Sequence, residues 1–132
     1  MSLDNVSRET MVGLEIEKAY KTMEECEILA ANNSWSGAAG RLYYSAFHAV
    51  CALLIHDSYP VKTHKGAGIA FSQRYIHTNI LPAKYGELYF QLENLREKSD
   101  YDCFYKVWKE DVITRIPVAK EMIDTIAAMV KE

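Results

Sequence analysis

Proline and glycine are scarce in this chain, which has three prolines and six glycines among its 132 residues. Antiparallel β-proteins need many tight turns, and these two residues are the ones that most often form them. No run of strand length alternates between apolar and polar residues, which is the pattern of a half-buried strand. The sequence therefore predicts an all-α protein.

Cysteine is also rare, and three cysteines at unrelated spacings do not make a disulfide framework. We therefore expect a reduced, cytoplasmic protein. No basic region followed by an apolar run opens the chain, so we expect no secretion signal. The most apolar segment, residues 38–57, is interrupted by Arg41, His48 and His56. It falls short of the roughly 18 consecutive apolar residues of a membrane span, so we expect no membrane contact.

A surplus of basic charge is missing as well, because the formal net charge is −3. This argues against a general nucleic-acid binder. The charge is nevertheless uneven, with glutamates concentrated in residues 15–27 and no acid between Asp57 and Glu87. Several cationic or titratable residues fall in that acid-free section: Lys62, His64, Lys65, Arg74, His77 and Lys84. The section is basic enough for a phosphate or a short RNA.

Apolar residues recur in steps of three and four along most of the chain, which is typical of helices that bury one face. The expected helices cover residues 7–31, 35–57, 64–78, a stretch opened by Pro82, and 107–131. Pro117 lies inside the last of them and should kink or split it. We expect one domain over residues 1–132, folded as an up-and-down bundle of about five helices.

The stretch "AAGRLYYSAFHAVCALLIHD", residues 38–57, is apolar on nearly every side yet contains polar residues. At 100° per residue with Arg41 at zero, Tyr44 falls at about −60°, Ser45 at about +40° and His48 at about −20°. These four residues share one narrow strip. Because charge is costly to bury, the strip should face a cleft, a partner chain or compensating carboxylates.

Two interpretations of this strip stay open. In one, it is a hydrogen-bonded core network or a wet dimer seam. In the other, Arg41 holds an anionic group while His48 or Tyr44 moves a proton or orients the ligand, because arginine binds phosphate bidentately and histidine titrates near neutrality. Lys62 and His64, which follow in a loop, could touch the same anion.

The segments "AAGRLYYSAFHAVCALL", "KTHKG", "AFSQRYI" and "LENLREKSDYD" occur in this order and spacing. Together they resemble the HEPN domain, and in particular the small stand-alone HEPN proteins that are often encoded beside a minimal nucleotidyltransferase. The resemblance covers roughly residues 10–130. It implies a helical up-and-down bundle, in agreement with the periodicity.

Many HEPN domains are metal-independent ribonucleases that act as dimers, with an arginine followed after four to six residues by a histidine. Arg41 and His48 have six residues between them and match this spacing. In "REKSDYD", Arg96 and Tyr101 are present, but Asp100 stands where a histidine would be expected. Arg96 and Asp100 are also spaced for an ordinary ion pair within one helix.

The primary expectation from the resemblance is a HEPN protein that binds a nucleotide or RNA phosphate as part of a nucleotidyltransferase–HEPN, toxin–antitoxin-like pair. The expected ligand-binding residues are Arg41, Tyr44, His48, Lys62, His64, Arg96, Asp100 and Tyr101. One alternative is a metal-independent ribonuclease with Arg41 and His48 as catalytic residues, and another is a non-catalytic interaction or dimerisation module.

The expected partners are a second copy of the chain and a nucleotidyltransferase, for which Tyr101 would be an acceptor. The four histidines lack the spacing of metal ligands, so we expect no metal, and no cofactor is expected either.

Overall fold

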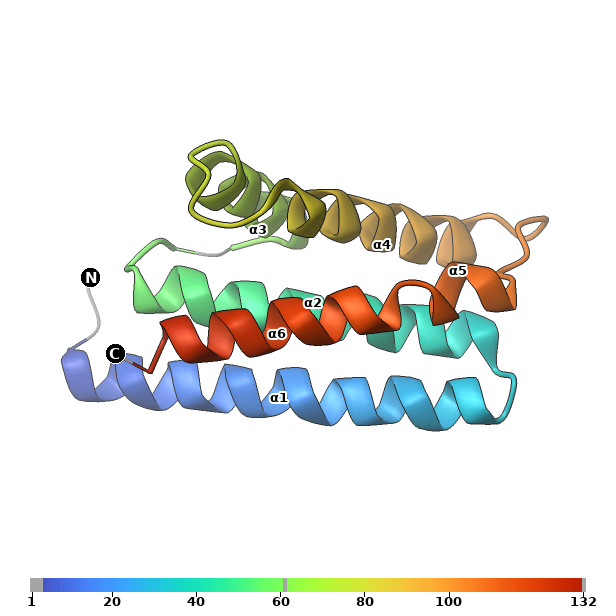
Figure 1. The fold of residues 1–132 in the computed structure, drawn as a ribbon, viewed down its shortest axis with the longest axis horizontal. Coiled ribbons are helices and arrows are strands. Elements are labelled where there is room, and N and C mark those ends of the chain that lie inside the picture. Colours follow the sequence, from blue (N-terminus) through green and yellow to red (C-terminus); the bar gives the residue numbers. More distant parts are fainter. Residues whose placement is uncertain (1–3, 61, 132) are drawn as a thin grey trace.

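The computed structural model describes residues 4–60 and 62–131, and all regular elements in this part of the chain are helical. The outer limits of the expected domain, residues 1 and 132, fall outside the described residues. The elements are α1 (Asn5–Ala31), α2 (Trp35–His56), α3 (His64–Phe71), the π-helical segment η1 (Ser72–Ile76), α4 (Ala83–Tyr101), α5 (Lys109–Ile113) and α6 (Ile116–Met129). The long helices α1, α2, α4 and α6 alternate in direction (Figure 1). The expected all-α bundle of about five helices is confirmed, since α5 and α6 together occupy the last expected helix.

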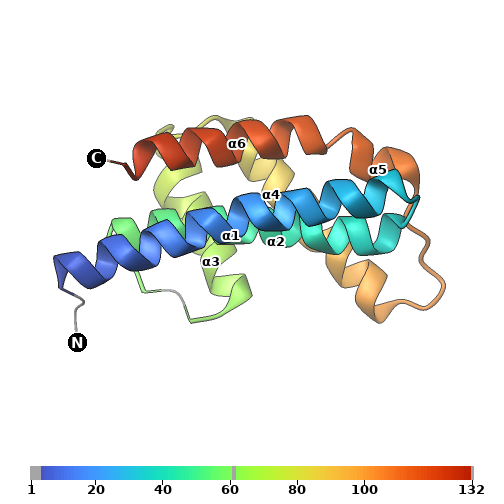
Figure 2. The ribbon, with the colours of Figure 1, turned by 90° about the horizontal axis from the view of Figure 1, so that it is seen from below.

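Helix α2 lies in the middle of the bundle and packs against α1, α3, α4, α5 and α6. Figures 1 and 2 show α1 on one side of α2 and the pair α3 and α4 on the other. Five alanines of α2 have no exposed surface, which lets neighbouring helices approach closely: Ala38, Ala39, Ala46, Ala49 and Ala52. By length and composition alone α2 could cross a membrane, but 67% of its most apolar window is buried inside the bundle. Such burial is typical of a core helix.

A tight turn joins α1 to α2 and makes the two helices antiparallel. Asn33 adopts a left-handed backbone with φ 59°. The amide of Asn33 donates to the carbonyl of Ala30 (3.0 Å), and the amide of Ser34 donates to that of Leu29 (2.8 Å). This pair of bonds is the Schellman motif, which satisfies the last carbonyls of a helix. The α1–α2 pair is therefore fixed by local hydrogen bonds as well as by packing.

The start of α3 is set by Thr63, whose Oγ1 accepts a hydrogen bond from the amide of Gly66 (2.8 Å). This cap places His64 in the first turn, beside α2. Farther along α3, a Cβ at Gly68 would lie 3.1 Å from Cε1 of Tyr89, so the glycine allows α3 to pack directly on α4. The cap fixes the start of α3, and the contact at Gly68 packs its middle against α4.

Two of the expected helices differ in detail from the structure. The helix expected over residues 64–78 is α-helical only to Phe71 and continues as a π-helix to Ile76. The expected split at Pro117 is confirmed, because α5 ends at Ile113 and α6 begins at Ile116 with the proline in its first turn. Proline fits there since the first helical amides have no partner within the helix.

Two helical glycines give a matched test of this packing, because Gly13 lies on an exposed face of α1 and Gly86 on a face of α4 that packs against η1. At Gly13 an added Cβ meets nothing within 4 Å, whereas at Gly86 it would lie 3.0 Å and 3.1 Å from side-chain carbons of Ile76. We expect Gly13→Ala to raise the free energy of unfolding by about 0.5–1 kcal/mol, because alanine favours helix. Gly86→Ala should lower it by up to about 2 kcal/mol, because overpacking outweighs that gain.

Urea unfolding of the two variants at one protein concentration measures both values. A stabilised Gly86→Ala would contradict the close contact between α4 and η1.

Candidate functional site

The polar strip of α2 faces glutamates of α1. Nη1 of Arg41 lies 3.4 Å from Oε1 of Glu25, and both side chains are 43% exposed. Nδ1 of His48 lies 3.0 Å from Oε1 of Glu15, and these two side chains are only 19% and 22% exposed. Compensating carboxylates, one of the three surroundings expected for the strip, are therefore present. The Arg41 pair is open to water and weak, while the His48 pair is well shielded.

The helical wheel placed Ser45 on this strip, but the structure buries it away from the strip's partners. It has no exposed surface, and its hydroxyl donates to the carbonyl of Leu42 at 2.7 Å. A serine can satisfy itself on its own helix in this way, so the core accepts it without a partner from another helix.

Tyr44 is the point where the cationic residues of two helices meet. The guanidinium carbon of Arg41 on α2 lies 5.4 Å from the centre of the Tyr44 ring, and that of Arg96 on α4 lies at the same distance. The ring of His64, at the start of α3, meets the Tyr44 ring edge-on at 5.7 Å, and that of His48 lies 6.5 Å away. We call Arg41, Tyr44, His48, His64 and Arg96 the Tyr44 cluster.

The guanidinium of Arg96 is incompletely satisfied. It also lies 5.4 Å from the centre of the Tyr43 ring. Its Nε is 3.4 Å from Oδ2 of Asp100, but Nε is buried and has no hydrogen bond to any described residue. A buried donor without an acceptor costs about 1–3 kcal/mol. The Asp100 carboxylate at 3.4 Å therefore compensates Arg96 by charge rather than by a hydrogen bond to Nε.

His64 lies against aromatic rings, although the residue is exposed at the surface. Its ring stacks on that of Phe47, with centroids 4.2 Å apart and planes tilted by 26°. Its Nδ1 lies 3.2 Å from the hydroxyl of Tyr43. Burial lowers the pKa of His64 below its usual 6.5, and the charges of Arg96 and His48 lower it further. The imidazole is therefore neutral at neutral pH and can accept a proton.

Beneath the Tyr44 cluster lie further buried polar groups. Burial raises the pKa of Tyr43 to about 12 and also raises that of Tyr89. The Tyr89 hydroxyl is buried and makes no hydrogen bond to a described residue. Burial and the charge of Glu97 raise the pKa of Glu93. The side chains beneath the arginines thus include Tyr43 and Tyr89, whose hydroxyls stay protonated at neutral pH.

The other expected site residues lie at increasing distance from the Tyr44 cluster. Asp100 contacts Arg96 within α4, as its spacing predicts. Tyr101 ends α4 and is 80% exposed. Lys62 is exposed, and the structure gives it no ion pair or hydrogen bond with any described residue. The structure therefore brings Arg41, Tyr44, His48, His64, Arg96 and Asp100 together, leaves Tyr101 at the edge and leaves Lys62 outside.

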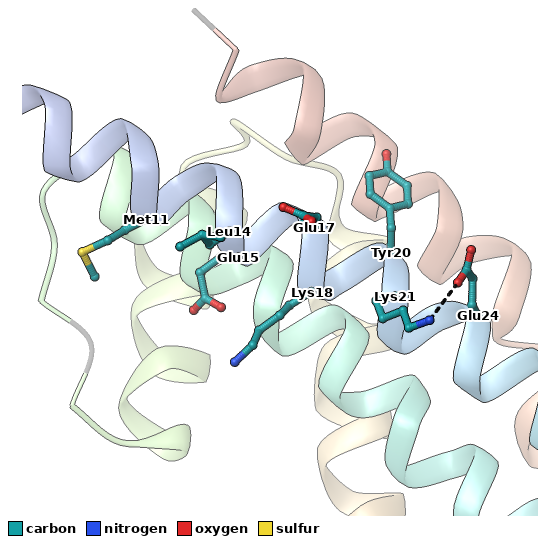
Figure 3. A pocket seen from close by; sticks show the side chains of 8 residues that line it. All are labelled: Met11, Leu14, Glu15, Glu17, Lys18, Tyr20, Lys21 and Glu24. Atoms are coloured by element: carbon teal, nitrogen blue, oxygen red, sulfur yellow. Dashed lines mark ion pairs between the residues drawn. The ribbon is translucent and has the colours of Figure 1, made fainter.

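A separate hollow of about 710 Å³ runs along the outer face of α1. Figure 3 shows its lining, with Glu15 and Lys18 on one side of the helix and Tyr20 on the other, toward α6. Met11 and Leu14 are 40% and 57% exposed there. All of the lining residues belong to α1, and the hollow is shallow with a mostly apolar surface. Glu15, which contacts His48 of the Tyr44 cluster, is one of the lining residues.

In residues 4–60 and 62–131, no three side chains of histidine, cysteine, aspartate or glutamate gather in a group that could hold a metal ion. The buried thiols are not poised as nucleophiles either, since burial raises the pKa of Cys26 and Cys51 to about 12.

Sequence reasoning missed four residues that shape the Tyr44 cluster: Glu15, Glu25, Tyr43 and Phe47. The glutamates had a signal in the acidic section 15–27, and their positions ten residues apart on α1 place them opposite Arg41 and His48. Tyr43 and Phe47 read as ordinary core aromatics. Their contact with His64 depends on how α3 returns to α2.

Comparison with known proteins identifies the family. The model of the HEPN domain matches residues 14–129. A protein of Methanocaldococcus jannaschii named "Putative toxin" is 35% identical over 96 residues, which are 73% of this chain and 65% of that protein. The chain thus spans a little less than two thirds of this relative. A "UPF0332 protein" of Thermotoga maritima is 24% identical over 115 residues, 87% of each chain. The match of the family model over most of the bundle shows that the chain belongs to the HEPN domain family.

Proposed function

We propose that this HEPN protein has a toxin-like function and binds a nucleotide or RNA phosphate at the Tyr44 cluster. Membership of the family and the toxin name of one relative support the first part. One observation carries the second part: the guanidiniums of Arg41 and Arg96, from different helices, both lie 5.4 Å from the Tyr44 ring centre.

Electrostatics favours an anion between these two helices. Two like charges near one ring repel each other, and a phosphate that bridges them converts this repulsion into two charge-assisted contacts. The carboxylates already present do not fill the site. Glu25 and Asp100 each sit 3.4 Å from their arginine and are 43% and 50% exposed, so these ion pairs are easily exchanged for a ligand.

The aromatic side chains next to the arginines favour the same ligand. Tyr43 and Tyr44 keep the guanidinium of Arg96 partly out of water, which strengthens its attraction for phosphate. His64, held neutral, adds a group that can donate one hydrogen bond without adding to the repulsion between the arginines. A phosphate would therefore contact the two arginines, with uncharged aromatic rings beneath them.

The first test removes the two guanidiniums together. In Arg41→Gln/Arg96→Gln, we expect the affinity for adenosine monophosphate and for inorganic pyrophosphate to fall about 10- to 100-fold, because hydrogen bonds to charged groups are lost. Isothermal titration calorimetry at low salt measures both ligands. Arg74→Gln is the matched control, since Arg74 also lies over a tyrosine, 3.6 Å from the centre of the Tyr59 ring, but outside the cluster.

Unchanged affinity in the double variant would remove the phosphate site at Tyr44. If the double variant instead unfolds or changes its oligomeric state while binding nothing, the strip is a structural interface.

A second candidate function, metal-independent cleavage of RNA, is favoured by the contact between Glu15 and His48. The carboxylate holds Nδ1 at 3.0 Å, which fixes the ring and leaves Nε2 as the nitrogen for proton transfer. In this reaction the ribose 2′-oxygen bonds to its neighbouring phosphorus as the bond from phosphorus to the 5′-oxygen breaks. His48 takes the 2′-hydroxyl proton, water or the returning imidazolium protonates the leaving oxygen, and Arg41 stabilises the charge on phosphorus.

This candidate predicts RNA cleavage that persists in EDTA and leaves 2′,3′-cyclic phosphate ends. His48→Ala should abolish it, and Glu15→Gln should reduce it by a smaller factor because the imidazole loses its orientation. His77→Ala, an exposed histidine outside the cluster, is the control and should cleave normally. Absence of any cleavage by the unaltered protein at large excess over RNA would rule the candidate out.

The outer face of α1 supports association of two copies of the chain. Its exposed Met11 and Leu14 lie beside Lys18 and Lys21, with Glu17 and Glu24 on the same hollow. A face with apolar side chains and charges of both signs can pair with a second, antiparallel copy of itself. Glu15 belongs to this face, so dimer formation would also enclose the His48 pair.

For this dimer, Leu14→Arg should convert the protein to a monomer, because it puts a charge into the apolar part of the contact. Sedimentation velocity over a range of concentrations measures the change. Ile69→Arg, at a 49% exposed isoleucine of α3, is the control and should stay dimeric. A monomeric unaltered protein, or a dimer that survives Leu14→Arg, would exclude this face.

The nucleotidyltransferase partner is proposed from the resemblance alone. The 80% exposure of Tyr101 makes its hydroxyl accessible to such an enzyme. Co-purification of this chain with a minimal nucleotidyltransferase would support the pairing, and its absence would contradict it.

A further inference from the structure

Large aromatic side chains stand exposed in the segment that joins α4 to α5. Phe104 is 94% exposed and Trp108 57%, and Tyr101, the last residue of α4, is 80% exposed. A single exposed aromatic residue is ordinary on a protein surface. Three within eight residues form a concentrated apolar surface, which usually marks a binding site.

The segment Asp102–Trp108 is irregular but held by its own hydrogen bonds. Oδ1 of Asp102 accepts from the amide of Phe104 at 3.0 Å, and the carbonyl of Asp102 accepts from the amide of Tyr105 at 3.0 Å. At the other end, Oδ2 of Asp111 accepts from the amide of Trp108 at 2.8 Å. Val107 is buried and fixes the middle. The exposed rings are therefore presented by an anchored backbone, and binding need not first order it.

Positive charge accompanies these rings. The ammonium of Lys106 lies 4.3 Å from the centre of the Trp108 ring, and that of Lys98 lies 5.7 Å from the Tyr105 ring. Neither lysine has an ion pair with a carboxylate of the described residues. Acids also lie in this segment: Asp100 contacts Arg96, Asp102 and Asp111 accept the backbone bonds above, and Glu97 and Glu110 are exposed. Among these mixed charges, Lys98 and Lys106 are the cations that lie directly against aromatic rings.

The surface is continuous with the Tyr44 cluster. Arg96, Asp100 and Tyr101 follow one another along the last turns of α4. The end of α4 is tied to the start of α2 by the hydroxyls of Ser36 and Ser99, which lie 2.5 Å apart. A chain of nucleotides with one phosphate at Arg41 and Arg96 can therefore continue over the segment that begins at Tyr101.

We propose that Tyr101, Phe104 and Trp108, with Lys98 and Lys106, form a stacking surface for unpaired bases of single-stranded RNA, an inference that rests on the phosphate site proposed at the Tyr44 cluster. Base-on-ring stacking beside backbone-tracking cations is how proteins hold single strands without reading a sequence. A duplex hides its base faces inside its own stack and needs a longer basic surface than a chain of net charge −3 provides.

The test compares alanine variants at exposed aromatic positions. Phe104→Ala and Trp108→Ala should each weaken binding of a single-stranded RNA of about ten nucleotides by roughly 5- to 100-fold, as expected for loss of one stacked base. Phe90→Ala, at a 63% exposed phenylalanine in the middle of α4, is the matched control and should bind normally. Fluorescence anisotropy with labelled RNA at fixed salt measures the affinities, and the same sequence as a duplex should bind weakly to all proteins.

A second measurement reports the stacking itself. The chain has two tryptophans, so in a Trp35→Phe background the emission comes from Trp108 alone. Single-stranded RNA should quench this emission, and inorganic pyrophosphate should leave it unchanged.

The outcomes separate this inference from the phosphate site. If the RNA affinity is unchanged in Phe104→Ala and Trp108→Ala but lost in Arg41→Gln/Arg96→Gln, the phosphate site stands and the stacking surface is wrong. If the alanine variants alter the oligomeric state and leave RNA binding intact, the surface contacts a second copy of the chain and the inference is also wrong. Failure of the unaltered protein to bind either RNA or pyrophosphate would overturn both proposals.

Discussion

The structure depends on the burial of α2, because this helix contacts each of the other α-helices in residues 4–60 and 62–131. Its alanines let the neighbouring helices approach closely, and the resulting core leaves one strip of polar residues on the helix partly exposed. That strip holds Arg41, Tyr44 and His48, whose polar groups cannot be buried without partners. The neighbours of α2 therefore had to supply carboxylates and aromatic rings at this strip. The candidate site follows from the same packing that stabilises the fold.

Much of the fold could be predicted from the sequence, because helices leave local signals. The periodic apolar residues gave the helices within a few residues, and Pro117 indicated the boundary between α5 and α6. The π-helix after Phe71 had no such signal. It depends on how the chain must turn between α3 and α4, which is set by contacts such as that of Ile76 with Gly86. These are contacts between elements that no local pattern encodes.

The candidate site also has one part that local sequence signals predict and one part that depends on contacts between helices. Arg41, Tyr44 and His48 could be placed together because they lie on one helix at fixed spacing. Glu15, Glu25 and Arg96 come from other helices, and their approach depends on the register and crossing angle of the bundle. Ser45 shows the limit of the helical wheel, because an angle on the wheel does not tell whether a hydroxyl bonds to its own helix. The wheel gives the side of a residue, and the neighbouring helices decide its surroundings.

The position of Tyr44 between arginines of α2 and α4 has a thermodynamic consequence. A ligand that touches both guanidiniums can bind only when these two helices are docked, so it binds the native state and not the unfolded chain. By mass action, such a ligand raises the apparent stability of the whole bundle as its concentration exceeds its dissociation constant. The interhelical seam thus couples occupancy of the site to the integrity of the fold, and the melting temperature of the protein becomes a readout of what the site binds.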